Sequence, residues 1–424
     1  MSTRATLFLL AILAADAAMA YETPQWRAVD VLPPAEQVGI FFTVKDPITT
    51  DGLMHQYSLD TKFGPMLAYG HRELQARLRE IHALEVASDT NDLDVIADTT
   101  RRRVEGTFRT VADAARDPIG LVQGLPRGIV NLFRGTAAQA RQFSRSASKA
   151  VHEKDNDQHE PSDDPLHDKA RRAGQAASRY ADHYLGLSAD ERAWYERLGV
   201  DPYTDNEALR RVVRHIARVE SATSLGLRFA SLPSIPFSGD LQRVMDNVYH
   251  EDPAVLRELR REALLGYGLS AEEVDDFESS MVLTPTRQLR LATAAAGLGG
   301  VQGRAVFFRQ VTRLKSADEA DIYVSGVERL TGLHRQHALG AVLPSIRLPG
   351  ATYADGSGIV VVVAVESLYW TPLVDAGERV LHAGLPATTS AAHLWITGAV
   401  SDEAQRQLSA RGWHVRDYAF EDSP

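Results

Sequence analysis

The chain has 424 residues, of which 44% are hydrophobic and 24% charged, with no cysteine and a formal net charge of −10. This composition is typical of a globular protein of about two to three domains, and it excludes a wholly disordered or collagen-like chain. The negative charge argues against electrostatic binding of nucleic acid. The missing cysteines exclude disulfides, thiol catalysis and thiolate metal sites.

Residues 1–20 have the three parts of a secretory signal peptide in the right order. Arg4 supplies a positive charge, Ala5–Ala15 is apolar, and Ala18-Met19-Ala20 matches the small-x-small cleavage pattern. We therefore expect export, with cleavage before Tyr21 and a periplasmic or peripherally envelope-associated product. The alternative is an N-terminal helix of a cytosolic protein. Since the remaining sequence holds no apolar stretch of about 18 residues, we expect no transmembrane span in the mature chain.

Residues 21–100 are interpreted as a strand-and-helix N-terminal region. Val38–Val44 has the β-branched and aromatic bias of a strand, and Asp46-Pro47 and Asp51-Gly52 are expected to be turns. From His71 the apolar residues follow the helical period, which predicts a helix.

Residues 101–150 differ from the rest of the chain in charge. They contain ten Lys/Arg and three Asp/Glu, a net charge of +7, so the rest of the chain carries −17. Arginines recur every seven residues in two rows, which places each row on one helix face opposite apolar residues. These are our candidate membrane- or partner-binding residues: Arg102, Arg109, Arg116, Arg127, Arg134 and Arg141.

Basic amphipathic helices of this kind suit an anionic lipid surface or an acidic protein, including the acidic linker of the same chain. A solvated face of a helix packed into the protein is the plainer alternative. That linker, residues 151–168, holds seven acids, one lysine and two prolines, and is predicted to be a mobile spacer. Its histidines follow no known metal-ligand spacing.

Residues 169–300 are predicted to form a helical array with clear start signals. Ser188 with Glu191, Thr204 with Glu207, and Ser270 with Glu273 match the capping box. Asp252-Pro253 places an N-cap residue before a proline at the first helical position.

Residues 301–424 are interpreted as a mixed α/β domain. We expect strands at Ala305–Phe308, Asp321–Val327 and Ile359–Tyr369, with a hairpin turn at Asp355-Gly356. The C-terminal segment is predicted to form a strand at His393–Thr397, a helix at Ser401–Arg411 and a strand at Trp413–Tyr418. The whole chain is thus predicted to be α+β, helix-rich in its N-terminal and central regions, with a C-terminal mixed α/β sheet domain.

Motifs for catalysis or for binding metals and cofactors are weak. Asp89–Asp94 lacks the glycine and glutamate of a calcium loop, and His334 with His337 lacks the zinc-protease spacing. Spacing singles out no set of serine, histidine and carboxylate as catalytic, so we assign no catalytic, cofactor or metal residue.

Two sequence segments resemble segments of a group of uncharacterised exported proteins of Gram-negative bacteria. They are Leu198–Leu209, LGVDPYTDNEAL, and Asp117-Pro118 followed by Gly124–Gly128. The resemblance implies an envelope location and no activity.

The sequence therefore predicts an exported, non-enzymatic envelope protein that contacts a membrane surface or an acidic partner through residues 101–150. The alternative is a periplasmic hydrolase or small-ligand-binding protein with a cleft between the helical array and the C-terminal sheet. That cleft would gather polar groups such as His334, His337 or Glu366.

Overall fold

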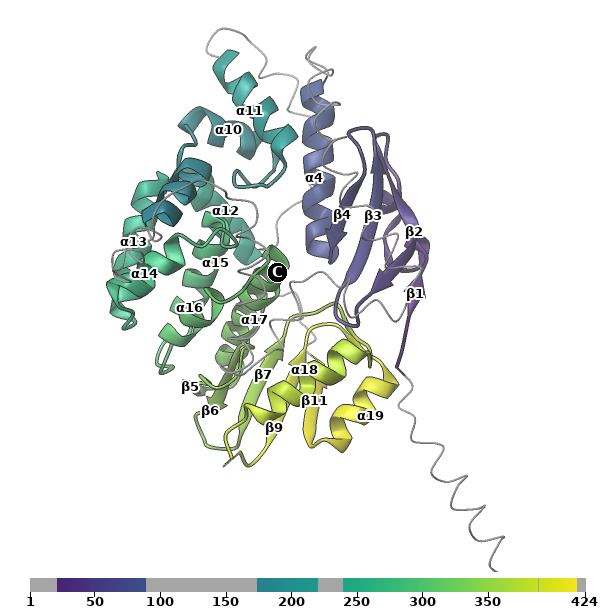
Figure 1. Cartoon of the computed structure of the whole chain (residues 1–424), viewed down its shortest axis with the longest axis vertical. Coiled ribbons are helices and arrows are strands. Elements are labelled where there is room, and N and C mark those ends of the chain that lie inside the picture. Colours follow the sequence, from purple (N-terminus) through teal and green to yellow (C-terminus); the bar gives the residue numbers. More distant parts are fainter. Residues whose placement is uncertain (1–20, 89–173, 220–238, 388, 418–424) are drawn as a thin grey trace, which may run out of the picture.

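The computed structural model describes residues 21–88, 174–219, 239–387 and 389–417. The N-terminal part forms a four-stranded antiparallel sheet, in the order β1-β2-β3-β4, followed by the long helix α4 (Figure 1). The elements of this part, with two short helices between β1 and β2, are β1 Gln25–Trp26, α2 Ala28–Val31, α3 Pro34–Gln37, β2 Phe42–Thr50, β3 His55–Thr61, β4 Met66–Tyr69 and α4 His71–Ser88.

The central part is helical, as its cap signals predict. After the helical residues 174–180, its elements are η2 Ala181–Leu185, α10 Ala189–Leu198, α11 Glu207–Val219, α12 Gly239–His250, α13 Pro253–Gly266, α14 Ala271–Glu278, α15 Pro285–Ala296, α16 Ala305–Val311 and α17 Ala317–Gln336. None of the helices in these described ranges has the length and apolar character that crossing a membrane requires.

The C-terminal part is a five-stranded mixed sheet with the order β11-β9-β7-β6-β5, and a separate parallel pair of β10 and β8. Its elements are β5 Leu339–Val342, β6 Gly350–Tyr353, β7 Ile359–Val363, β8 Ser367–Leu368, α18 Pro372–Ala383, β9 Ala392–Ile396, β10 Ala399–Val400, α19 Asp402–Ala410 and β11 Trp413–Asp417. The predicted α+β class, with helices before a C-terminal mixed sheet, is confirmed.

The strand β7 is buried at all five positions, as its unbroken apolar sequence predicts for a central strand. It pairs antiparallel with β6 and parallel with β9, and the predicted turn at Asp355-Gly356 joins β6 to β7. Helix α17 packs against β7, whereas α18 and α19 lie over the sheet in front of β9 and β11 (Figure 1).

Two predicted strands are wrong, because Ala305–Phe308 begins α16 and Asp321–Val327 lies inside α17. The β-branched and aromatic residues there suggested strands, yet Ala320, Val324 and Val327 are buried at helical spacing. The stronger signal was Ser316, whose hydroxyl accepts a hydrogen bond from the Glu319 amide and caps α17.

Smaller corrections concern the predicted turns and caps. Asp46-Pro47 is not a turn but lies within β2, at an irregularity in the pairing between β2 and β3. The Ser188 and Ser270 capping boxes and the Asp252 cap are confirmed. Helix α11 is capped instead by Asn206, whose side-chain oxygen accepts from the Leu209 amide.

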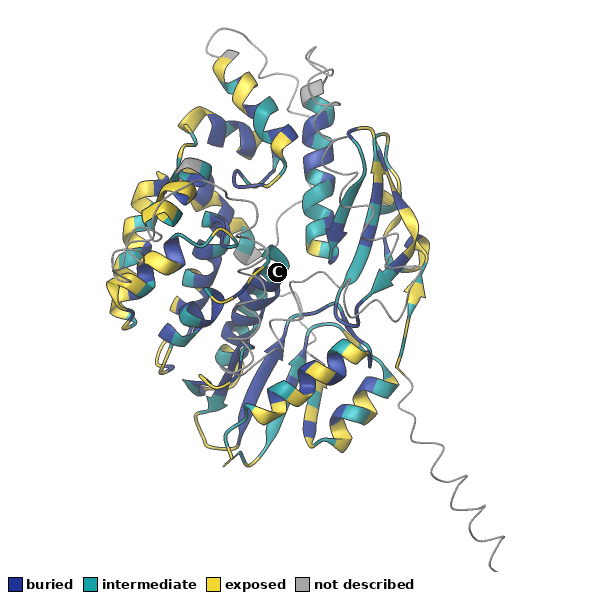
Figure 2. Ribbon diagram, in the orientation of Figure 1, coloured by how far each residue is buried: buried dark blue, intermediate teal, exposed yellow. Residues whose placement is uncertain are grey.

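Two hydrophobic cores hold these elements together. One joins α13–α17 to the C-terminal sheet and its helices α18 and α19. The other joins the N-terminal sheet and α4 to the helices α10–α12. Buried residues dominate α15 and α17, whereas α13 and α14 present many exposed residues at the edge of the molecule (Figure 2). Helices α4, α15 and α17 therefore meet where the two cores adjoin.

Candidate functional site

The chain turns sharply into α4 at Gly70, where three regions of the molecule meet. Gly70 has φ +87°, and a Cβ there would lie 2.4 Å from the methyl group of Met54. The positive φ therefore favours glycine, whereas the flexible end of Met54 could move aside for a Cβ. The Tyr69 amide donates to Glu73 at 2.8 Å, and the His71 amide donates to Glu366. Carboxylates thus satisfy free amides at the start of α4.

A group of charged side chains, which we call the charged junction, lies between α4, α15 and α17. Its members are Arg72, Glu73 and Arg77 from α4, Arg287 and Arg290 from α15, Asp318, Asp321 and Glu328 from α17, and Asp205 from the segment before α11.

Helices α15 and α17 are joined by two-pronged ion pairs. Arg287 donates to both oxygens of Asp321 at 3.0 and 2.6 Å, and Arg290 to both oxygens of Glu328 at 2.8 Å. Arg290 also reaches Asp321 at 3.2 Å. Burial acts to raise the pKa of Asp321, but the two arginines outweigh it and hold that pKa at about 2. This part of the junction is fully paired.

Arg77 joins α4 to the segment before α11. Its guanidinium contacts Glu73 at 2.8 Å, Glu80 at 3.0 Å and Asp205 at 2.7 Å. The last contact has two prongs, because a second nitrogen lies 3.2 Å from the other Asp205 oxygen. Such planar pairs fix orientation as well as distance, so α4 is held in place against the helical array.

Asp318 is the exception in this network. Its half-exposed carboxyl has no hydrogen bond and no ion pair within the part of the chain that the structure describes. Burial raises the pKa of Asp318 to about 7, and the neighbouring carboxylates of Glu73 and Asp321 act in the same direction. A carboxyl with this pKa exchanges its proton near neutral pH, as a general acid or base must.

Arg72 is the least tightly paired arginine of the junction. Its guanidinium lies 3.8 Å from Glu328, which already binds Arg290, and its side chain is 41% exposed. The positive charge of Arg290, with burial, lowers the pKa of Arg72 to about 10. Asp321 interacts electrostatically with both Arg72 and Asp318. The junction thus combines tight ion pairs with one carboxyl without a partner, Asp318, and one arginine with only a long ion pair, Arg72.

Glu366 lies next to the start of α4 and links it to β3. It accepts hydrogen bonds from the amides of His55, at 2.9 Å, and of His71. Its carboxylate also lies 3.1 Å from Nδ1 of His55, which the Tyr57 hydroxyl approaches to 3.3 Å. His71 in turn pairs with Glu36 at 2.5 Å. These contacts chiefly join the N-terminal sheet to the segment after β7.

The three polar residues that the sequence suggested are not brought together. Glu366 joins this cluster, but His334 lies at the far end of α17, where it bonds the Gly299 carbonyl at 3.1 Å. His337 packs instead against the rings of Tyr353 and Trp395. No group of three or more His, Asp or Glu side chains in the described ranges is arranged to hold a metal ion.

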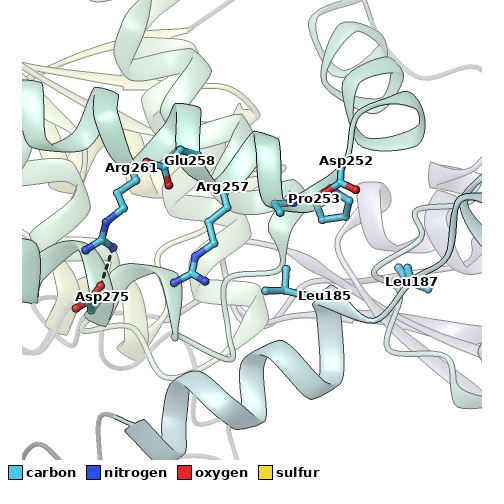
Figure 3. Close-up of a pocket in the computed structure, with 9 residues that line it drawn as sticks. Leu185, Leu187, Asp252, Pro253, Arg257, Glu258, Arg261 and Asp275 are labelled. Atoms are coloured by element: carbon cyan, nitrogen blue, oxygen red, sulfur yellow. Dashed lines mark hydrogen bonds and ion pairs between the residues drawn. The ribbon is translucent and has the colours of Figure 1, made fainter.

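A separate pocket of about 490 Å³ lies within the helical array, beside the start of α13 (Figure 3). Its walls are partly apolar and partly charged, and Figure 3 shows Arg257 and Arg261 extending from α13 in the same direction. The lining residues are Leu185, Leu187, Asp252, Pro253, Ala254, Arg257, Glu258, Arg261 and Asp275. The expected position for a site was between the array and the C-terminal sheet, and this pocket is not there.

The residues that the sequence singled out most strongly lie outside the described part of the chain. This applies to Arg102, Arg109, Arg116, Arg127, Arg134 and Arg141, to the acidic linker at 151–168, and to the segment Asp89–Asp94. Their interpretation stays a prediction.

The strand prediction for Asp321–Val327 concealed the part of the charged junction that lies on α17. In a strand, Asp321 and Glu328 would lie about 23 Å apart, whereas on a helix seven residues bring them back to one face. The Ser316 cap was the signal that could have corrected this.

Comparisons with protein-family models, curated proteins and solved structures give no match for this chain.

Proposed function

We propose that this is an exported small-ligand-binding protein whose site is the charged junction, and that a cationic group of the ligand pairs with Asp318. The observation that carries the proposal is the free carboxyl of Asp318 in a network where the neighbouring acids Glu73 and Asp321 have arginine partners. Perturbed carboxyls of this kind concentrate at functional sites.

The chemistry of the junction favours a cation at this point. Asp318 is raised to a pKa of about 7 because burial and two carboxylates oppose its charge. An ammonium group bound there would supply the missing counter-charge and favour ionised Asp318. An uncharged ligand would do neither. The signal-like residues 1–20 support the exported part of the proposal.

The test uses the mature chain, residues 21–424, with 1,4-diaminobutane as the probe and butanol as its uncharged counterpart. Binding is measured by titration calorimetry at pH 6 and pH 8, a range in which aliphatic amines stay protonated. We expect the diamine to bind and the affinity to rise by up to about ten-fold from pH 6 to pH 8, because Asp318 becomes ionised.

The matched variants are Asp318→Asn and Asp276→Asn. Asp276 is an exposed acid on α14 whose carboxylate has no hydrogen bond or ion pair to any other described residue. The proposal requires Asp318→Asn to remove both the binding and its pH dependence while Asp276→Asn keeps both. Equal behaviour of the two variants, or equal binding of butanol, would reject it.

A second candidate function is contact with an anionic membrane surface or an acidic protein through residues 101–150. It rests on the sequence observation of a +7 segment with arginines at seven-residue spacing, inside a chain of net charge −10. We expect the mature protein to sediment with anionic vesicles, less so as salt rises. Charge reversal of Arg127, Arg134 and Arg141 to Glu should abolish sedimentation, and unchanged sedimentation would rule the contact out.

A further inference from the structure

The pocket beside α13 is built around arginines that share one carboxylate. Glu278, on α14, is 3% exposed and accepts from Arg257 at 2.9 Å and from Arg261 at 3.2 Å. A third guanidinium, that of Arg260, lies 3.9 Å away and is 6% exposed. Three positive charges therefore surround a single buried negative charge. Only Arg261 has a second carboxylate partner among the described residues, Asp275 at 2.7 Å.

The bonds to Glu278 use only its Oε2, so its buried Oε1 and some of the arginine donors have no hydrogen-bond partner. Nε of Arg260 is buried and has no hydrogen-bond partner. Burial lowers the pKa of Arg260, and the positive charge of Arg257 contributes. Arg257 uses only its Nε on Glu278, and its two terminal nitrogens make no hydrogen bond to the rest of the described chain. These terminal nitrogens extend toward the pocket, between Asp275 and Leu185 (Figure 3).

We infer that this pocket binds a small organic carboxylate, with the carboxylate on the free nitrogens of Arg257 and the hydrocarbon part against Leu185, Leu187 and Pro253. A guanidinium presents two parallel N–H groups that match a carboxylate. The apolar wall gives the rest of the molecule a surface that excludes water. The pocket volume of about 490 Å³ is within the range of small-molecule sites.

The acids that line the pocket set its selectivity. Asp275 is paired with Arg261, and Asp252 caps α13 by accepting from the Ala254 amide at 2.7 Å. Glu258 is the remaining acid, and it has no hydrogen bond or ion pair to the other described residues. Its charge opposes the bound carboxylate, so Glu258→Gln should strengthen binding. This site shares no residue with the charged junction. The experiment below therefore tests it independently of the proposed function.

The test compares three probes on the mature chain by titration calorimetry: hexanoate, hexanol and inorganic phosphate. We expect hexanoate to bind more tightly than either of the others, because hexanol lacks the charge and phosphate lacks the apolar part. Arg257→Gln should weaken hexanoate binding by about ten-fold or more, as expected for a lost charged hydrogen bond. Arg257→Lys should keep part of the affinity.

The control is Arg335→Gln, which removes an exposed arginine of α17 that has no ion pair to the other described residues. It should leave hexanoate binding unchanged. The inference is overturned if hexanol binds as well as hexanoate, if phosphate competes equally, or if Arg257→Gln and Arg335→Gln give the same affinity. Arg257→Lys keeps a positive charge beside the carboxylate of Glu278. It therefore allows the hexanoate affinity to be compared with that of Arg335→Gln even if Arg257→Gln unfolds.

Discussion

The charged junction and the α13 pocket solve the burial of arginine in opposite ways. In the junction each of Arg77, Arg287 and Arg290 has its own carboxylate, and the group left over is an acid, Asp318. In the pocket three arginines share Glu278, and the group left over toward the pocket is the pair of terminal nitrogens of Arg257, while Arg260 Nε and Glu278 Oε1 stay buried without a hydrogen bond. The comparison teaches that the unpaired group of a network, rather than its number of ion pairs, indicates which charge a ligand should bring.

The largest effect is expected at the shared carboxylate. Glu278→Gln would leave the buried guanidinium of Arg260 without a nearby negative charge. Removing one member of a buried ion pair costs about 3–5 kcal/mol, because the other charge stays buried and uncompensated. Chemical denaturation at pH 7 measures this loss. A cost below about 1 kcal/mol would show that Glu278 does not hold the arginines together.

A smaller effect is expected at Asp321 in the junction. Asp321→Asn removes a partner from Arg287 and Arg290, but Arg290 keeps both of its bonds to Glu328. The Asp321 side chain is also 34% exposed, so water can replace part of the lost interaction. We expect about 1–3 kcal/mol of destabilisation by denaturation. A cost equal to that of Glu278→Gln would contradict the contrast between separate and shared partners.

Substitution of Asp318 should stabilise the protein, unlike the two substitutions above, and the size of the effect should depend on pH. Its folded pKa of about 7 lies above the unfolded value, so the ionised form is the one that burial disfavours. Ionisation of Asp318 therefore contributes a loss of stability as pH rises from about 4 through 7, and Asp318→Asn should abolish that contribution.

The expected difference between Asp318→Asn and the unchanged chain is near zero at pH 4. It grows to a gain for the variant on the order of 2 kcal/mol at pH 8, after allowance for solvent screening of a half-exposed group. Urea denaturation at several pH values provides the curve. A stability difference that does not change with pH, or a variant that is less stable than the unchanged chain at pH 8, would contradict the interpretation of Asp318 as a carboxyl without a partner.

The smallest stability effect is expected for Arg257→Gln. This side chain is 43% exposed and makes one hydrogen bond to Glu278, which keeps its bond to Arg261. We expect a change within about 1 kcal/mol, together with the loss of hexanoate binding described above. A larger loss of stability would mean that Arg257 supports the helix packing rather than a ligand.

Local signals predicted much of the fold. The apolar run of β7, the turn before it, and the Ser188 and Ser270 capping boxes each depend on residues close together in the sequence. The failures were also local, since the β-branched and aromatic residues of α16 and α17 predict strands where the chain forms helices. Tertiary packing of a buried helix face overrides such propensities.

The candidate sites could not be predicted in the same way. Arg72 and Glu328 are 256 positions apart in the chain, and Arg257 and Glu278 belong to different helices. The sequence does not indicate which of these charged residues pair, because pairing depends on how the helices pack. Burial and neighbouring charges, which determine each pKa, depend on the same packing. Glu366 was suggested from the sequence, but its contacts with His55 and His71 depend on the meeting of two distant segments.

The sequence by itself determined the cysteine-free composition, the α+β class, several helix caps and the charge contrast between residues 101–150 and the rest of the chain. Only the tertiary structure decided that Asp318 has no partner among the described residues and that Arg257 lines a pocket. The physical reason is range: caps and turns are satisfied within a few residues, whereas a buried charge is balanced by whichever side chains the packing of distant helices brings beside it.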